Sequence, residues 1–353
     1  MTATLLVNLG SHNVKLSWQD GIGERQHWQV PADTSPETVL AALPTATLSV
    51  HRLVHGGDVL PTAACWSPSL DQALTALDDI APLHNPPARR WATACAVRWP
   101  QARHVLVPDT GLFRDLPEAV RTLPLPQALR ARYGLRQHGY HGLAHAGLLQ
   151  GLRTVAPQLA DGRVITLQLG GGCSATAWHL GRPLDTSMGF TPLAGLVMGT
   201  RPGNLDPGVL LYLLRQGMTV DSLDDTLNKS SGLLGLSGRS SDLRELLAAN
   251  DAASGLAIEQ FCLRVRQVIG SQTATLGGLD ALVFGGGIGE HQGEVRARIV
   301  APLGCLGISL KDQPTPDLPA RLDDGTRPVA VWALPGREED QMLSQALACL
   351  ETR

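Results

Sequence analysis

Two arginines of this 353-residue sequence lie beside glycine turns, where an anion could be bound. Arg52 belongs to VHRLVHGGD (50–58), and Arg201 belongs to MGTRPGN (198–204). Apolar neighbours favour a strand that ends at the glycine pair after Arg52, although a helix would place Arg52 and His55 one turn apart. A guanidinium binds a carboxylate or phosphate through two parallel hydrogen bonds, which lysine cannot copy. Two such arginines suit a reaction between an anionic nucleophile and a phosphoryl group, whereas ordinary surface arginines are the competing interpretation.

Three histidines, His138, His141 and His145, fall within RQHGYHGLAH (136–145). They could be metal ligands, but no acidic or cysteine partner lies at ligand spacing, and a lone histidine is usually structural. His141 directly precedes Gly142, in a turn predicted to open a helix. Because a helix N-terminus favours negative charge nearby, His141 is the better catalytic candidate.

A short repeat links the two halves of the chain. VNLGSHNVKLSW (7–18) and LQLGGGCSATAW (167–178) share, at an offset of 160, an amide residue, Leu-Gly and a tryptophan. Each segment is predicted to form a strand, a tight turn and a second strand. Small residues at the tips, such as Gly170 and Gly172, let backbone N–H groups point at phosphate oxygens. The match is either a coincidence between two hairpins or the mark of two related domains that hold a polyphosphate between them.

The remaining pattern alternates strands with helices and predicts an α/β protein. VFGGGIGEH (283–291) is typical of a strand, a glycine turn and the start of a helix. Such a segment occurs both in nucleotide sites and in purely structural turns, and this one lacks the lysine of a P-loop. Strands are predicted at 47–54, 104–107, 281–284 and 329–334, and helices at 70–77, 89–97, 259–276 and 338–350.

Composition restricts the class of protein. Hydrophobic residues make up 43% and charged residues 17% of the chain, as in soluble globular proteins, and no apolar run reaches membrane-spanning length. The N-terminus lacks the features of a signal peptide. Six scattered cysteines without a CxxC pair argue against a zinc site and favour a reducing compartment. The net charge of −3 gives no reason to expect a nucleic-acid partner.

Taken together, the motifs resemble those of the acetate kinase family in residue identity, order and spacing along almost the whole chain. The segments that carry the resemblance are NLGSHNVK (8–15), HRLVHGGD (51–58), APLHNPP (81–87), PDTGLFRDLP (108–117), YGLRQHGYHG (133–142), ITLQLGGGCSATA (165–177), DTSMGFTPLAGLVMGTRPGNLDP (185–207), LNKSSGLLGLSGRSSDLRE (227–245), FGGGIGEH (284–291) and LPGREED (334–340).

The resemblance implies an α/β fold of two duplicated ribonuclease-H-like (actin-like ATPase) domains with a cleft between them. The N-terminal domain would comprise 1–110 plus 340–353, and the nucleotide-binding domain 111–339. The implied protein is a cytoplasmic homodimer without nucleic-acid or membrane partners. It would transfer the γ-phosphoryl group of ATP to acetate by direct in-line attack, with Mg²⁺ or Mn²⁺, giving ADP and acetyl phosphate.

The resemblance also implies a role for each matching residue. The catalytic residues would be Arg52, Asp109, His141 and Arg201, and the metal would be bound by Asn8 and Glu338. The carboxylate substrate would be bound by Arg52, Val54, Leu83 and Pro192. The nucleotide would be bound by Ser11, Lys15, Gln168, Gly170, Gly172, Asp242, Arg244, Gly287 and Gly289.

Several positions depart from the family pattern. Members are usually longer, and the deficit falls mostly between residues 19 and 50. Gln168 stands where the family has His, Gly171 where it has Asn, Phe113 where it has His, and Asn13 where it has Ser. Gln168 can donate a hydrogen bond but cannot carry a positive charge. Gln168, Gly171 and Phe113 make a non-catalytic nucleotide-binding paralogue one alternative interpretation. A propionate or butyrate kinase, which would differ in the width of the pocket around Val54 and Pro192, is the other.

Overall fold

The chain folds into two compact units, each assembled from separate stretches. The structure is a computed structural model that describes residues 3–10, 13–21, 23–82, 84–311 and 317–352. The first unit contains Met1–Arg114, Tyr140–Ala146 and Arg337–Arg353, and the second contains Asp115–Gly139 and Gly147–Gly336. The domain boundaries expected from the sequence stay a prediction. Ser11 and Leu83 lie outside the described residues.

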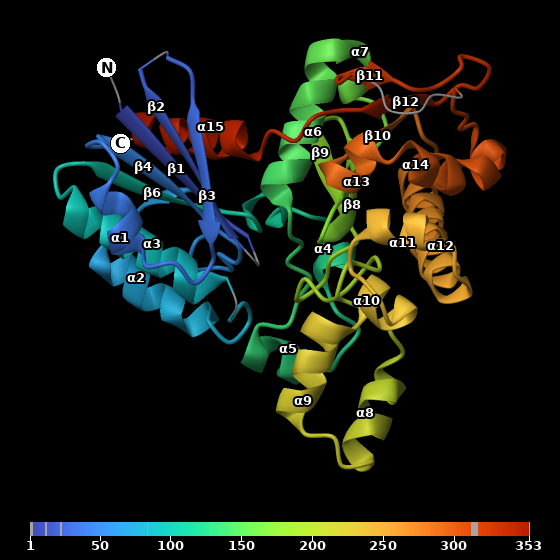
Figure 1. The fold of residues 1–353 in the computed structure, drawn as a ribbon, viewed down its shortest axis with the longest axis horizontal. Helices are drawn as coiled ribbons and strands as arrows, with labels where there is room; N and C mark the ends of the chain where they lie inside the picture. The colour runs from blue at the N-terminus through green and yellow to red at the C-terminus, as the bar shows by residue number, and fades with distance from the viewer. Residues whose placement is uncertain (1–2, 11–12, 22, 83, 312–316, 353) are drawn as a thin grey trace. The chain divides into compact units, whose positions relative to one another are not determined.

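The first unit is built on a six-stranded mixed sheet with the order β3-β2-β1-β4-β6-β5 (Figure 1). β1 pairs antiparallel with β2 and parallel with β4, and β4 pairs parallel with β6. The strands are β1 (Ala3–Leu9), β2 (Asn13–Asp20), β3 (Gln26–Pro31), β4 (Leu48–Leu53), β5 (Ala64–Cys65) and β6 (Arg103–Pro108).

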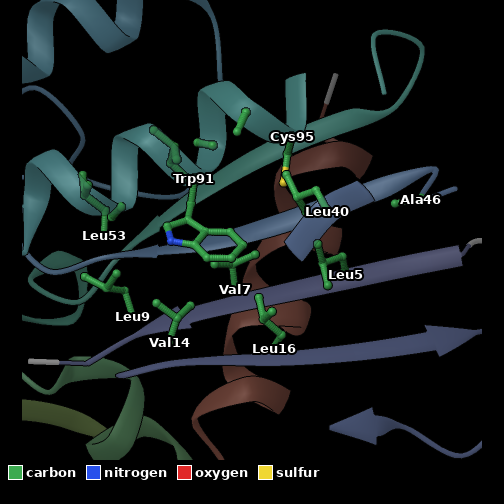
Figure 2. Close-up of a cluster of buried hydrophobic side chains, with 14 of the residues drawn as sticks. Leu5, Val7, Leu9, Val14, Leu16, Leu40, Ala46, Leu53, Trp91 and Cys95 are labelled. Carbon is green, nitrogen blue, oxygen red and sulfur yellow. The ribbon is translucent and has the colours of Figure 1, made fainter. Parts of the chain in front are cut away.

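Alternation along β1 explains why both faces of this sheet are covered. Leu5, Val7 and Leu9 point to one face, where Trp91 of α3 (Asn85–Arg98) packs over them (Figure 2). α1 (Pro36–Ala41) contributes Leu40 to the same cluster, and α2 (Pro68–Leu74) contributes its own buried leucine. Leu6 points to the other face and belongs to a second cluster with Met342 and Ala346 of α15 (Glu338–Glu351). A strand covered on both faces is expected to be mostly apolar, and the middle of β1, residues 5–7, is apolar throughout.

The second unit repeats this topology. Its sheet has the order β11-β12-β10-β7-β8-β9, and β7, β8, β9, β10, β12 and β11 occupy the places of β1, β2, β3, β4, β6 and β5 with the same relative directions. The duplication inferred from the sequence repeat is therefore confirmed. The strands are β7 (Val164–Leu169), β8 (Cys173–His179), β9 (Arg182–Thr186), β10 (Ala281–Gly285), β11 (Ala320–Arg321) and β12 (Ala330–Ala333).

The two hairpins differ at their tips. Leu9 pairs with Val14 across a four-residue connection, whereas Leu169 pairs with Cys173 across three residues. Residues that correspond at the offset of 160 therefore have cross-strand partners that differ by one position between the two hairpins.

Some helices of the second unit pack on its sheet. The longest, α12 (Ala252–Leu276), lies against β8 and begins earlier than the predicted 259 because Asp251 caps it, accepting a 2.8 Å hydrogen bond from Ser254 N. The other helices are α4 (Glu118–Arg121), α5 (Gln127–Tyr133), α6 (Gly142–Val155), α7 (Pro157–Ala160), α8 (Pro207–Arg215), α9 (Val220–Asp225), α10 (Gly232–Ser237), α11 (Leu243–Ala249), α13 (Gly286–His291) and α14 (Gly293–Val300). The first turn of α6 belongs to the first unit. No helix in the described part of the chain is long and apolar enough to cross a membrane.

A polar cluster is buried in the first sheet. Ser49 Oγ lies 2.8 Å from His51 Nε2 and 2.7 Å from His104 Nδ1, and all three side chains are buried. Burial, together with the nearby His104, lowers the pKa of His51 to about 3, and burial also lowers the pKa of His104. Both imidazoles are therefore neutral in the folded protein at neutral pH.

This cluster predicts a loss of stability in acid. The pKa of His51 is depressed in the fold, so the unfolded chain takes up a proton that the folded chain does not. The stabilisation is present above about pH 6.5 and declines below it, by up to about 1.4 kcal/mol per pH unit for each such histidine. Urea unfolding between pH 7.5 and 5 should show a shallower pH dependence for His51→Leu than for wild type. The exposed His179→Gln is the control, and equal slopes for wild type and His51→Leu would contradict the assignment.

Candidate active site

Three predicted site residues lie at the carboxyl ends of adjacent parallel strands. Asn8 is near the end of β1, Arg52 is near the end of β4, and Asp109 directly follows β6. The backbone N–H of Asp109 donates a 2.8 Å hydrogen bond to Leu53 O, which extends the pairing of β4 with β6 beyond the last strand residue. The carboxyl edge of parallel strands is where α/β proteins place ligand-binding groups.

The Asp109 carboxylate is the centre of this cluster. Its Oδ2 accepts hydrogen bonds from Arg52 Nη2 at 2.6 Å and from His141 N at 3.2 Å, and its Oδ1 accepts one from Leu143 N at 3.0 Å. The side chain is 1% exposed. Burial alone would raise the pKa of Asp109, but the charges of Arg52 and His141 and these hydrogen bonds outweigh burial and lower it. Asp109 is therefore an ionised carboxylate whose lone pairs are committed to the protein, which suits a positioning role.

The turn that carries His141 is held by the same carboxylate. His141 has φ of 61°, a left-handed conformation that costs a residue with a side chain roughly 1–2 kcal/mol. Gly142 N donates to Asp109 O at 3.1 Å, and a Cβ on Gly142 would lie 2.1 Å from that oxygen, so only glycine fits here. Asp109, at the end of β6, thus caps the N-terminus of α6. The prediction that a helix opens at Gly142 is confirmed.

Asn8 and Glu338 are joined directly. Asn8 Nδ2 donates to Glu338 Oε2 at 3.0 Å, and Asn8 Oδ1 accepts from Arg52 Nη1 at 3.2 Å. Burial alone lowers the pKa of Arg52, but the charges of Asp109 and Glu338 outweigh it and raise the pKa. Mg²⁺ commonly binds through one or two protein oxygens, with water and phosphate supplying the rest, and this carboxylate–amide pair has the donor chemistry it needs. Among the described residues no group of three or more His, Cys, Asp or Glu side chains forms a metal cluster.

In the second unit, Arg201 lies beside the tip of the β7–β8 hairpin. Gly199 N donates to Gly171 O at 3.2 Å, which joins the MGTRPGN turn to that tip. Arg201 Nη1 donates to Pro192 O at 2.9 Å, so these two predicted site residues are in direct contact. Burial lowers the pKa of Arg201, and burial raises that of the nearby Cys173 thiol to about 12. Arg201 is thus a partly desolvated cation without a carboxylate bonded to it among the described residues.

Gln168 lies beneath the glycine turn of α13. A Cβ on Gly286 would come within 2.9 Å of Gln168 Nε2, and the amide Oε1 is buried with no hydrogen bond from any described residue. Glu290 Oε1 holds this turn by accepting from Gly286 N and Gly336 N at 3.0 Å each. The Gln168 side chain therefore contacts the start of the turn that contains Gly287 and Gly289, and its role at the nucleotide phosphates stays a prediction.

The other predicted residues are placed less centrally. Val54 is buried, and Lys15 is exposed on β2 in register with Asn8. Asp242 caps α11 by accepting from Arg244 N at 2.8 Å, and Arg244 forms an exposed ion pair with it. Their roles stay predictions.

The sequence analysis missed a buried network behind the catalytic turn. Asn85 exchanges two hydrogen bonds with the backbone of His55, at 2.8 and 3.1 Å, and Tyr140 Oη lies 3.3 Å from His55 Nδ1. Tyr140 precedes His141, so this network supports the turn from the interior. Asn85 belongs to the quoted APLHNPP motif, and its position between a histidine and two prolines was the available signal.

A family model described as the Acetokinase family matches residues 35–339. The chain belongs to the acetokinase family. Acetate kinase of Rhodopseudomonas palustris (strain TIE-1) is 37% identical over 389 aligned positions, which cover 97% of this chain and 96% of that protein. Among solved structures, Porphyromonas gingivalis acetate kinase superposes with a TM-score of 0.87 at 29% identity, covering 99% of this chain and 100% of that one. A propionate kinase from Francisella tularensis subsp. tularensis SCHU S4 superposes with a TM-score of 0.88 at 28% identity, covering 98% and 99%.

Membership fixes the coarse chemistry of the site. Acetokinase-family proteins are phosphotransferases with a carboxyl acceptor, and the family implies ATP and Mg²⁺. The two sheets match the actin-like two-domain fold of acetate kinases. The fold and the family expected from the motifs are confirmed.

Gln168 provides a test of the nucleotide loop. A neutral amide gives one donor to a phosphate oxygen, where an imidazolium would give a charged one. Gln168→His should keep or raise turnover, and Gln168→Ala should lower it roughly tenfold, measured as steady-state kinase activity. If both variants instead lose thermal stability while the folded protein keeps wild-type kinetics, Gln168 is only a structural strand residue.

Proposed function

We propose that this protein is an acetate kinase that phosphorylates acetate with ATP, reversibly, to give acetyl phosphate and ADP. The observation that supports it most is the Arg52–Asp109–His141 cluster at the strand ends of the first unit, in a chain of the acetokinase family. Acetate is the proposed acceptor because relatives similar over most of the chain are acetate kinases.

The proposed chemistry needs no general base. An acetate oxygen, already ionised at neutral pH, attacks the γ-phosphorus in line while the bond from that phosphorus to the ADP oxygen breaks. Arg52 and Arg201 are proposed to bind the acyl carboxylate and the transferring phosphoryl group, and to offset the repulsion between them. His141 would donate to the equatorial oxygens, where negative charge is spread in the transition state. Asp109 would fix the orientation of Arg52 and of the His141 turn.

The metal is proposed to be held by Glu338 and Asn8, directly or through water. When bound, Mg²⁺ or Mn²⁺ would neutralise charge on the β- and γ-phosphate oxygens. Ser11, Lys15, Gly170 and Gly172 would bind phosphates, and Gly287, Gly289, Asp242 and Arg244 the adenosine. Val54, Leu83 and Pro192 would form a small apolar wall around the methyl group of acetate.

Substrate choice is the decisive experiment. Purified protein with ATP and Mg²⁺ should release ADP fastest with acetate, compared with propionate and butyrate as kcat/KM in a coupled assay. One extra methylene is worth about 1–3 kcal/mol, so the ratio should be at least about fivefold. A preference for propionate or butyrate would overturn acetate as the acceptor. ADP binding without ADP formation from any acid would indicate a non-catalytic paralogue.

The variant Arg201→Ala tests the proposed role of Arg201 in the same assay. Each charge-assisted bond to an anion contributes roughly 1.5–3 kcal/mol, so loss of a bidentate pair should slow the reaction by about a hundredfold or more. Arg182→Ala, which removes an exposed arginine of β9, is the control. Activity of Arg201→Ala within about threefold of wild type would remove this arginine from the reaction.

We also propose that the protein is a cytoplasmic homodimer. α8 leaves apolar side chains in solvent, with Leu211 53% and Tyr212 60% exposed, and such a patch on one helix suits a second copy of the chain. None of the six cysteines forms a disulfide, in keeping with a reducing compartment. Sedimentation should give a dimer for wild type and a monomer for the double variant Leu211→Asp, Tyr212→Asp. A wild-type monomer would refute the proposal.

A further inference from the structure

A cavity of about 650 Å³ lies in the second unit, and none of the described residues that line it is proposed to bind ATP or acetate. It is bounded by one face of α14, by the short helix η4 (Ala301–Leu306) and by the segment 308–311, with Leu322 and Arg327 completing the wall. Its volume is within the range of small-molecule sites.

A buried cation lines this cavity. Arg296 of α14 is 2% exposed, and its Nη1 donates two 2.8 Å hydrogen bonds, to Gly289 O and Glu290 O at the end of α13. These acceptors are neutral. Its Nε and Nη2 make no hydrogen bond, and its guanidinium no ion pair, with any residue that the structure describes. Burial lowers the pKa of Arg296. Among the described residues, this desolvated cation has no negative partner of the kind that usually compensates for burial.

Two further cations face the same space from other segments. Lys311 and Arg327 belong to the part of the cavity wall that lies outside α14. Backbone hydrogen bonds from Lys311 N to Leu322 O, at 2.7 Å, and from Val329 N to Gly307 O, at 3.1 Å, hold that wall in place. Of the described residues that line the cavity, Glu294 is the only carboxylate, and it forms an ion pair with Arg298.

Apart from Glu294, the described residues that line the cavity bring one more carboxylate near it, that of Asp324. Ser309, which lines the wall, donates to Asp324 at 2.7 Å, so that carboxylate is engaged by a hydroxyl. Ala297, Val300, Ile308 and Leu322 supply the apolar part of the lining. The cavity therefore combines three cations with an apolar wall.

We propose that this cavity binds a small organic anion that carries two or more negative groups. The negative groups would pair with Arg296, Lys311 and Arg327, and the carbon skeleton would contact the apolar wall. Such a ligand would supply the negative partner that no described residue gives Arg296. The proposal stands independently of the proposed kinase reaction, because it uses none of the same residues.

Binding of citrate and of pyrophosphate, measured without magnesium by calorimetry and thermal shift, tests the site. The buffers are matched in ionic strength with sodium chloride. The pocket variant is Lys311→Gln with Arg327→Gln, both exposed side chains, and Arg296 is left in place because it holds α13. The control variant, Lys229→Gln with Arg182→Gln, removes the same two charges elsewhere in the second unit.

Wild type and the control variant should bind at least one probe, with a raised Tm, and the pocket variant should bind it at least about tenfold more weakly. Binding of citrate alone indicates a polycarboxylate ligand, and binding of pyrophosphate alone indicates a phosphorylated one. The proposal is overturned if neither probe binds beyond the chloride control, or if the pocket variant binds both probes as wild type does. Equal weakening in the two double variants would also overturn it, because the effect would then be one of net charge.

Discussion

The buried ion pair between Arg52 and Asp109 is the interaction on which the arrangement of the first unit's site depends. Its two side chains are 12% and 1% exposed, so both charges are removed from water and each would be costly without the other. The same carboxylate also accepts from the backbone at the start of α6, and the same guanidinium reaches Asn8. One pair of charges therefore ties together β1, β4, β6 and the turn of His141. A consequence is that Arg52 is a structural residue as well as a candidate ligand, so its removal should cost stability as well as activity.

Duplication explains how one scaffold presents two kinds of site. Both sheets share a strand order, and in each the first hairpin leads into the parallel strands. In the first unit the strand ends carry ionised side chains that suit a metal and an anion. In the second unit the corresponding region has glycines, whose backbone N–H groups can approach phosphates, and the partly buried Arg201. The one-residue difference between the hairpin tips shows that local turn chemistry diverged while strand pairing was kept.

Much of this could be predicted from the sequence. Apolar runs located β1, β4, β6, β7 and β10, and the repeat around Asn8 and Gln168 raised duplication as one of two interpretations. The family resemblance selected Asn8, Arg52, Asp109, His141 and Glu338, which the structure brings into one cluster. What could not be predicted depends on long-range contacts. That Asp109 caps α6 requires residues 109 and 143 to meet, and no local pattern encodes this. In the sequence, Ser49, His51 and His104 are only polar residues within two apolar strands. The pairing of β4 with β6 brings the three side chains together. Gln168 matched the repeat, but the sequence does not show that its amide lies beside the Gly286 turn, nor that its buried oxygen has no hydrogen bond from a described residue.

The central claim is that Arg52 and Asp109 stabilise the fold as a pair and so hold the site in place. A double-mutant cycle with Arg52→Ala, Asp109→Ala and the double variant, read as the free energy of unfolding at pH 7.5, tests it most directly. Each single change leaves one buried charge unpaired and should destabilise by about 3–5 kcal/mol. The double variant removes both charges, so the coupling energy should be at least about 2 kcal/mol. A coupling energy below about 0.5 kcal/mol, as for an exposed surface pair, would contradict the account.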